Sequence, residues 1–189
     1  MNDRLSTGRR RTINAPTQTS MILKIVKYGE SVLARPTEQV TAFDRELREL
    51  VDNMLETMYA APGVGLAATQ VGIGRRLFVM DCSTEKDKRQ KIALINPVIE
   101  SEEGEQIGQE GCLSVPGFYF DIKRPRKVVA RGQDLDGNPV VLEVRDLEAR
   151  CISHEVDHLD GKLLLVHLSP LKRDMLERKV KKKMKRGDW

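Results

Sequence analysis

The segment His154-Glu155-Val156-Asp157-His158 contains two histidines four residues apart, with a glutamate beside the first. On a helix this spacing places both imidazoles on one face, with Cβ atoms about 5–6 Å apart, so both reach the same cation. Glu155 leaves the helix at a different angle, from which its carboxylate is placed to take a proton from water at a metal. Two of the three histidines of the chain fall in this motif. A metal centre is therefore favoured over a chance pair on an amphipathic helix.

The residues around the motif predict the helix that carries it. One buried stripe with i, i+4, i+7, i+11 spacing comprises Leu147, Cys151, His154 and His158. No proline interrupts this stretch, and Gly161 is placed to end the helix.

Two histidines need a further ligand, and the chain offers three candidates. The metzincin pattern requires another histidine where this chain has Leu164, so that class fails. Glu177 is the only glutamate after the motif, but it lies among basic residues on a tail expected to face solvent. Cys112 supplies a thiolate, a good ligand for zinc or iron(II), although many free cysteines are simply small buried apolar side chains. Local spacing leaves these last two interpretations of Cys112 open.

Composition predicts a globular protein without a membrane span. The 189 residues are 40% hydrophobic and 32% charged, and no run of eighteen apolar residues or apolar leader segment occurs. Cys82, Cys112 and Cys151 are too widely spaced for a disulfide scaffold, which favours a reducing, cytoplasmic compartment.

The two ends of the chain differ from its middle. Residues 1–20 are polar and Arg-rich with little apolar periodicity, which predicts a flexible extension or, alternatively, an organelle transit segment. Residues 21–189 are expected to form one domain. Near the C-terminus, Lys179 to Arg186 is a basic block, typical of a solvated helix end or of a surface that faces a polyanion.

The remaining pattern predicts an α+β fold with antiparallel strands. A helix is expected from an N-cap at Thr41 to Pro62-Gly63, and a last helix from Ser169-Pro170. The glycine-rich stretch from Gly63 to Gly72, directly after the first of these helices, lacks the residues of a phosphate loop or of a dinucleotide fingerprint. Residues 83–91 are expected to form a charged surface loop, and Asp136-Gly137-Asn138 a hairpin turn. Strands are predicted at Arg76–Cys82, Ile92–Ile99, Lys127–Asp134 and Val140–Val144.

Three blocks of sequence together resemble the signature motifs of the peptide deformylases. They are G-V-G-L-A-A-T-Q at Gly63 to Gln70, E-G-C-L-S at Glu110 to Ser114, and H-E-V-D-H at His154 to His158. The resemblance extends from Met21 through the final helix. It implies antiparallel β-sheets packed around a central metal-binding helix, with a C-terminal helix. It also implies hydrolytic removal of the formyl group from the N-terminal formylmethionine of newly made proteins.

The resemblance assigns roles to individual residues. One divalent metal would be held by Cys112, His154 and His158, with iron(II) native and zinc, nickel or cobalt as replacements. Glu155 would act as general base and then as acid, and Gln70 with the backbone N–H of Leu113 would stabilise the oxyanion. Contacts with the substrate are expected from Val64, Gly65, Gly111, Leu147 and Cys151. The expected partners are N-formylmethionyl nascent peptides and, through the basic C-terminal helix, the ribosome, with the enzyme a monomer.

Two positions depart from the family pattern. Ser153 stands where glutamine is common before the first histidine, and residues 117–120 lack the arginine that some bacterial members carry there. The first departure leaves the ligands untouched, and the second affects the rim where substrate is selected.

Two other functions compete with deformylation: an HExxH metallopeptidase that cleaves peptide bonds, and a non-catalytic, metal-stabilised module that binds through its basic tail.

Overall fold

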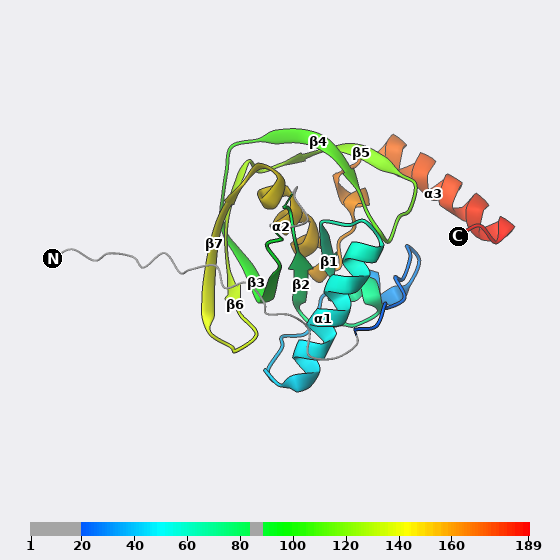
Figure 1. The fold of residues 1–189 in the computed structure, drawn as a ribbon. Coiled ribbons are helices and arrows are strands. Elements are labelled where there is room, and N and C mark those ends of the chain that lie inside the picture. Colours follow the sequence, from blue (N-terminus) through cyan, green and yellow to red (C-terminus); the bar gives the residue numbers. More distant parts are fainter. Residues whose placement is uncertain (1–19, 84–88) are drawn as a thin grey trace.

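A computed structural model describes residues 20–83 and 89–189, and the predicted extension at 1–20 lies outside this range except for Ser20. Two antiparallel sheets enclose a central helix (Figure 1). The larger sheet has the strand order β1–β2–β3–β6–β7, and β4 pairs with β5. The strands are β1 Gly65–Ala67, β2 Leu77–Met80, β3 Ile92–Glu103, β4 Gln106–Gly111, β5 Tyr119–Arg124, β6 Lys127–Gln133 and β7 Pro139–Arg145. The α+β class and the antiparallel sheets predicted from the sequence are confirmed.

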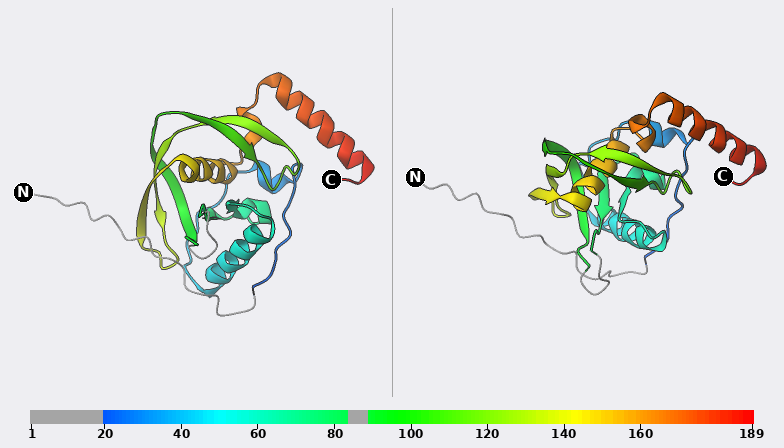
Figure 2. Two further views of the ribbon diagram at one scale, coloured as in Figure 1. Left: turned by 45° about the horizontal axis from the view of Figure 1, so that its top comes forward. Right: turned by 90° about the horizontal axis from the view of Figure 1, so that it is seen from above.

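The central helix is α2, Asp146–Leu159, which carries both histidines of the motif. It lies within the curve of the strands (Figure 2), where Ile152 and Leu159 are fully buried among sheet residues such as Phe78 and Leu142. Gly161 follows the helix with φ of +72°, the left-handed conformation that glycine adopts without strain. The predicted end of this helix is therefore confirmed, and its buried apolar face fixes the two histidines relative to the sheet.

Helix α1, Arg45–Ala60, begins later than predicted. Asp44, not Thr41, is the N-cap, and its carboxylate accepts a hydrogen bond of 3.0 Å from the Leu47 N–H. Both residue types are good caps, but an apolar face that starts at Leu47 requires the first turn to begin at Arg45. That face, which includes Val51, packs against β1 and β2.

The strands that sequence patterns missed are β1, β4 and β5. β1 has three residues, and β4 is interrupted by Gly108 and contains both charged and polar residues, so neither has the alternation of a half-buried strand. The four predicted strands are present, although β3 extends to Glu103 with two irregularities in its pairing to β6. The hairpin turn at Asp136-Gly137-Asn138 joins β6 to β7 as predicted.

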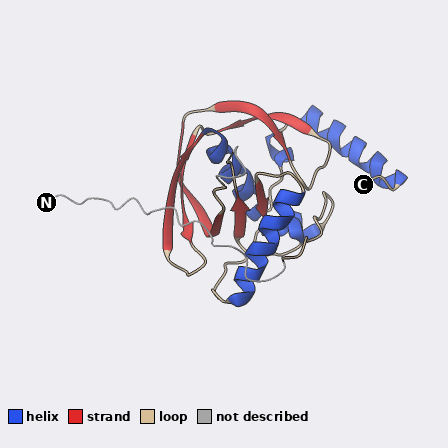
Figure 3. Ribbon diagram, viewed as in Figure 1, coloured by secondary structure: helices blue, strands red, loops and turns tan. Residues whose placement is uncertain are grey.

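Helix α3, Pro170–Arg186, projects from the edge of the molecule (Figure 3). Ser169 caps it as predicted, and only Leu176 and Val180 are buried within it. The chain then turns back: the Trp189 indole N–H donates a 3.0 Å hydrogen bond to the Tyr28 carbonyl, and its ring lies near Phe118. One apolar stripe thus attaches the helix and leaves its basic faces exposed. None of the helices in the described ranges is long and apolar enough to cross a membrane.

Candidate metal centre and active-site cleft

The three predicted metal ligands meet at one point. His154 and His158 project from α2, and Cys112 directly follows β4. One ligand atom from each lies within 4.8 Å of the others, and the Cys112 Sγ is 3.2 Å from the His158 Nε2. The two imidazoles meet edge to face with centroids 5.0 Å apart. One thiolate and two imidazoles form a donor set that suits zinc or iron(II).

The environment of Cys112 favours the thiolate. Burial by itself would raise the pKa of this thiol, but the charge of His158 and hydrogen bonds from both histidines lower it to about 5. Because a metal binds the deprotonated sulfur, the site is prepared to take up a cation at neutral pH. This environment favours the ligand interpretation of Cys112 over that of a small apolar core side chain.

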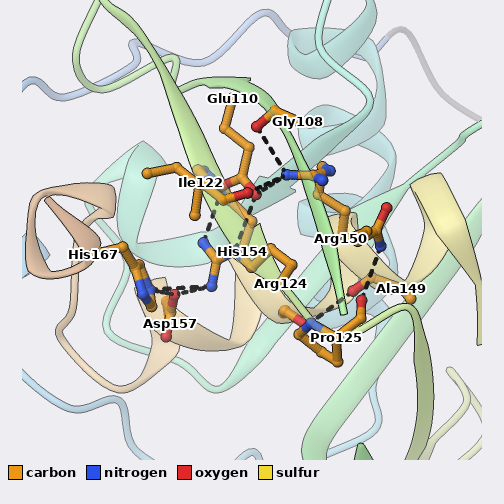
Figure 4. A network of polar contacts seen from close by, with 12 residues as sticks. Gly108, Glu110, Ile122, Arg124, Pro125, Ala149, Arg150, His154, Asp157 and His167 are labelled. Atoms are coloured by element: carbon orange, nitrogen blue, oxygen red, sulfur yellow. Dashed lines mark hydrogen bonds and ion pairs between the residues drawn. The ribbon is translucent and has the colours of Figure 1, made fainter. Parts of the chain in front are cut away.

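Glu110 orients one of the histidines. Its Oε2 lies 3.1 Å from the His154 Nδ1, and Arg124 binds the same carboxylate through two hydrogen bonds of 3.0 Å (Figure 4). Burial alone would raise the pKa of Glu110, but hydrogen bonds from His154 and Arg124 and the charge of Arg124 lower it to about 2. The carboxylate therefore stays ionised and accepts the hydrogen bond from Nδ1, which directs the His154 Nε2 toward Cys112, the side on which a metal would be held.

The same network continues away from the metal centre. The Arg124 Nη1 also contacts the Asp157 Oδ2 at 2.5 Å, and that oxygen lies 2.7 Å from the His167 Nε2 (Figure 4). Glu110 and Arg124 in short strands, and Arg150 on α2, were missed as functional residues because charged side chains are ordinarily exposed. The position of Glu110 two residues before Cys112 was the one available signal.

Glu155 is the buried carboxylate beside the predicted ligands. It is 3% exposed, and its Oε2 has no hydrogen-bond partner within the described part of the chain. Burial raises the pKa of Glu155, opposed by the charges of His154 and His158. A desolvated carboxylate with an open acceptor oxygen is suited to exchange a proton with a group placed in the cleft.

The backbone of Gly65 packs directly against this carboxylate. A Cβ added at Gly65 would lie 2.7 Å from the Cys151 Sγ and closer still to the Glu155 Oε1. The position therefore has no room for a side chain, whether or not substrate also approaches the backbone there.

We expect Gly65→Ala to displace Glu155 or β1, because the three nearest atoms that the new Cβ would overlap belong to the buried Glu155 and Cys151 side chains of α2. Overpacking of this kind costs about 1–3 kcal/mol in free energy of unfolding. Thermal unfolding, and the activity that the sequence resemblance implies, measured on the same variant, check this expectation. Gly74→Ala is the control, because a Cβ there meets nothing within 4 Å. Unchanged stability and activity of Gly65→Ala would contradict the predicted overlap.

Gln70 is held with its amide group toward the metal centre. It belongs to the short 3-10 helix Ala68–Val71, is 1% exposed, and accepts a 2.9 Å hydrogen bond from the Ala67 N–H on its Oε1. Its Nε2 consequently faces the Cys112 Sγ at 3.6 Å. Leu113, the residue after that cysteine, lines the same cleft. Both residues predicted to supply the oxyanion donors therefore line the cleft beside the ligands.

The cleft has a volume of about 400 Å³ and lies between β1 and the end of β4. Its lining includes every residue predicted to contact substrate, namely Val64, Gly65, Gly111, Leu147 and Cys151. One expectation was wrong: Leu147 is 45% exposed rather than part of a buried stripe. It lies in the first turn of α2, where the helix emerges at the mouth of the cleft.

Cys151 and Ser153 have local structural partners. The Cys151 thiol donates to the Val64 carbonyl at 3.5 Å, and a hydrogen bond with Cys82 together with burial raises its pKa. This thiol is therefore protonated and unreactive at neutral pH. The Ser153 hydroxyl donates to the Ala149 carbonyl at 2.9 Å within α2, so the departure at this position leaves the histidines in place.

A buried Cys-His-His centre beside a glutamate, in a cleft within an α+β fold, defines a metal-dependent hydrolase. The sequence model described as polypeptide deformylase matches residues 22–174. The chain belongs to the peptide deformylase family, whose members remove the formyl group from newly made peptides; cleavage of peptide bonds is not favoured.

Individual relatives and solved structures agree with this placement. The chain is 47% identical over 169 residues to a peptide deformylase of Acidobacterium capsulatum, covering 89% of this chain and 99% of the relative. It is 49% identical over 163 residues to that of Azotobacter vinelandii, covering 85% and 95%.

Two crystal structures of peptide deformylases share the fold. The enzyme from Legionella pneumophila superposes with a TM-score of 0.80 at 42% identity, covering 87% of this chain and 96% of the other. The enzyme from Ehrlichia chaffeensis, in complex with actinonin, gives 0.81 at 39% identity, covering 86% and 98%.

Proposed function

We propose that this chain hydrolyses the formyl group of N-formylmethionyl peptides through Cys112, His154, His158 and Glu155. The observation that carries the proposal is the convergence of three ligand atoms within 4.8 Å, beside a buried carboxylate with an open oxygen. The reaction consumes one water and yields formate and a free amino terminus.

Iron(II) is the proposed native metal, with zinc, nickel or cobalt able to replace it. The lowered pKa of Cys112 and the orientation of His154 by Glu110 fit a divalent cation held by all three ligands. When bound, such a metal supplies a Lewis acid and lowers the pKa of water.

Glu155 is the proposed proton carrier. Its carboxylate takes a proton from the attacking water and, after the tetrahedral intermediate forms, gives it to the departing amine nitrogen. The burial that raises the pKa of this carboxylate makes the second transfer feasible near neutral pH. One group thus performs both transfers and is regenerated.

Gln70 and the Leu113 N–H are the proposed donors to the oxyanion. Because the Gln70 Oε1 is engaged by the Ala67 N–H, the Nε2 is the group that faces the cleft. Donors fixed in this way stabilise developing charge without reorganising during the reaction.

Strand pairing is the proposed way to hold the peptide. β1 is the outer strand of its sheet, and its first residue, Gly65, lines the cleft together with the preceding Val64, opposite Gln109 to Gly111. An extended peptide can hydrogen-bond to such an open strand edge. The methionine side chain of the substrate then lies against Val64, Leu147 and Cys151.

Formate release from an N-formyl-methionyl tripeptide tests the proposal. Protein prepared anaerobically, with its metal content measured on the same sample, should release formate rapidly with about one metal per chain. Cleavage of the internal peptide bond without formate would support the metallopeptidase alternative. A fully metallated sample with neither product would contradict the proposal.

The exposed basic faces of α3 are proposed to contact ribosomal RNA. Lys181, Lys182 and Lys185 are exposed, whereas the helix is anchored by Leu176 and Val180. Lysines on such a surface bind phosphates in a salt-dependent manner.

We expect the triple change of Lys181, Lys182 and Lys185 to Gln to weaken co-sedimentation with ribosomes several-fold at low salt. Neutralisation is preferred to truncation because Trp189 packs against Phe118 and Tyr28. The control neutralises three other exposed lysines, Lys24, Lys123 and Lys162. Equal loss in the control, or binding insensitive to salt, would contradict a site on α3.

Residues 21–189 are proposed to be one catalytic domain that acts as a monomer. Three buried apolar clusters, which between them involve α1, both sheets, α2 and α3, support this organisation. A cytoplasmic location is proposed, with an organelle as the alternative if residues 1–20 act as a transit segment. Gel filtration and fractionation of cells that express the full chain test these assignments.

A further inference from the structure

Arg150 is a buried cation at the wall of the cleft. It lies on α2 one turn before His154, and its side chain is 11% exposed. Its Nη1 donates to the Glu110 Oε1 at 2.9 Å and to the Gly108 and Ile122 carbonyls at 3.1 and 3.2 Å (Figure 4). One nitrogen therefore joins α2 to both strands of the smaller sheet.

The neighbouring strand is shaped to admit this guanidinium. A Cβ at Gly108 would lie 2.9 Å from the Arg150 Nη2. Gly108 thus lets β4 approach the arginine closely, and the position of Glu110 along β4 depends on the same contact. Arg150 is also part of the cleft lining, whereas Arg124 extends in the other direction toward Asp157 and His167.

Arg124 and Arg150 act differently on the Glu110 carboxylate. Arg124 contacts both oxygens, so it suffices to balance the negative charge. Arg150 contacts Oε1 only and comes from the same helix as His154, whose Nδ1 donates to Oε2. The carboxylate is consequently fixed relative to the helix that carries the metal ligands.

We propose that Arg150 is a positioning residue for the metal centre: it holds Glu110 so that His154 presents its Nε2 to the metal. The proposal rests on the proposed metal ligation by Cys112, His154 and His158. It predicts that loss of Arg150 loosens the metal centre while the charge on Glu110 remains paired with Arg124.

Binding of cobalt(II) to the purified full chain tests this role without relying on activity. Competition with a chromophoric chelator gives the dissociation constant, and the visible absorption of cobalt reports the ligand geometry. Because loss of a residue that orients a ligand typically weakens metal binding 10–100-fold, we expect Arg150→Met to do so and to shift the cobalt absorption bands. Arg150→Lys, which keeps a cation near Glu110 but not the planar fork, should recover part of the affinity.

Arg76→Met is the matched control. Arg76 is also a largely buried arginine that pairs with an acid at α2, contacting the Asp160 Oδ1 at 2.9 Å at the helix end. We expect this variant to lose stability and keep cobalt affinity.

Unchanged affinity and spectrum in Arg150→Met, or equal weakening in both variants, would overturn the proposal. If Arg150→Met does not fold, unchanged affinity and spectrum in Arg150→Lys would overturn it instead. Failure of the wild-type chain to bind cobalt through a thiolate would instead refute the metal centre itself.

Discussion

Replacing Glu155 by Gln should lower formate release by about 10²–10⁴-fold while leaving the metal content near one per chain. Glutamine has nearly the same shape but exchanges no proton, so both proposed transfers fail together. The three ligands are separate side chains, and the substitution removes a charge that burial already disfavours. Metal binding and folding should therefore persist.

Single-turnover formate release and metal analysis on the same preparation check this expectation. Glu148→Gln is the control, because Glu148 lies on α2 outside the cleft lining. Activity within a few-fold of the wild type in Glu155→Gln would contradict its role as proton carrier. Loss of metal along with activity would indicate a structural role in the metal centre.

Replacing Gln70 by Ala should lower turnover by about 10²–10³-fold, the usual effect of removing one fixed oxyanion donor. The loss should fall on kcat rather than KM, since the amide stabilises charge that appears only as the intermediate forms. The geometry supports a large effect, because the Ala67 N–H holds the Gln70 carboxamide in one orientation. In the wild type the Nε2 donor is therefore fixed before the oxyanion forms.

Steady-state kinetics on an N-formyl-methionyl peptide distinguish the two parameters. Gln109→Ala is the control, because this exposed glutamine lines the same cleft on the opposite strand. Full activity of Gln70→Ala would show that the Leu113 N–H and the metal suffice for the oxyanion. A change in KM alone would assign Gln70 to substrate binding.

The local sequence determined the chemistry of the site. A helix of 3.6 residues per turn places His154, Glu155 and His158 by spacing alone, and the end of that helix at Gly161 follows from backbone preference. The strands with a regular apolar pattern, β6 and β7, were predictable for the same reason. Each of these features depends on residues close together in the chain.

Tertiary structure decided what depends on distant residues. Cys112 joins the histidines because the end of β4 lies beside α2, and spacing alone could not separate a ligand from a buried thiol. Glu110, Arg124 and Arg150 form one ionised cluster only because two strands and a helix bury them together. Burial and partner choice are properties of the packed chain, so the orientation of His154 and the exposure of Leu147 were fixed only by the fold.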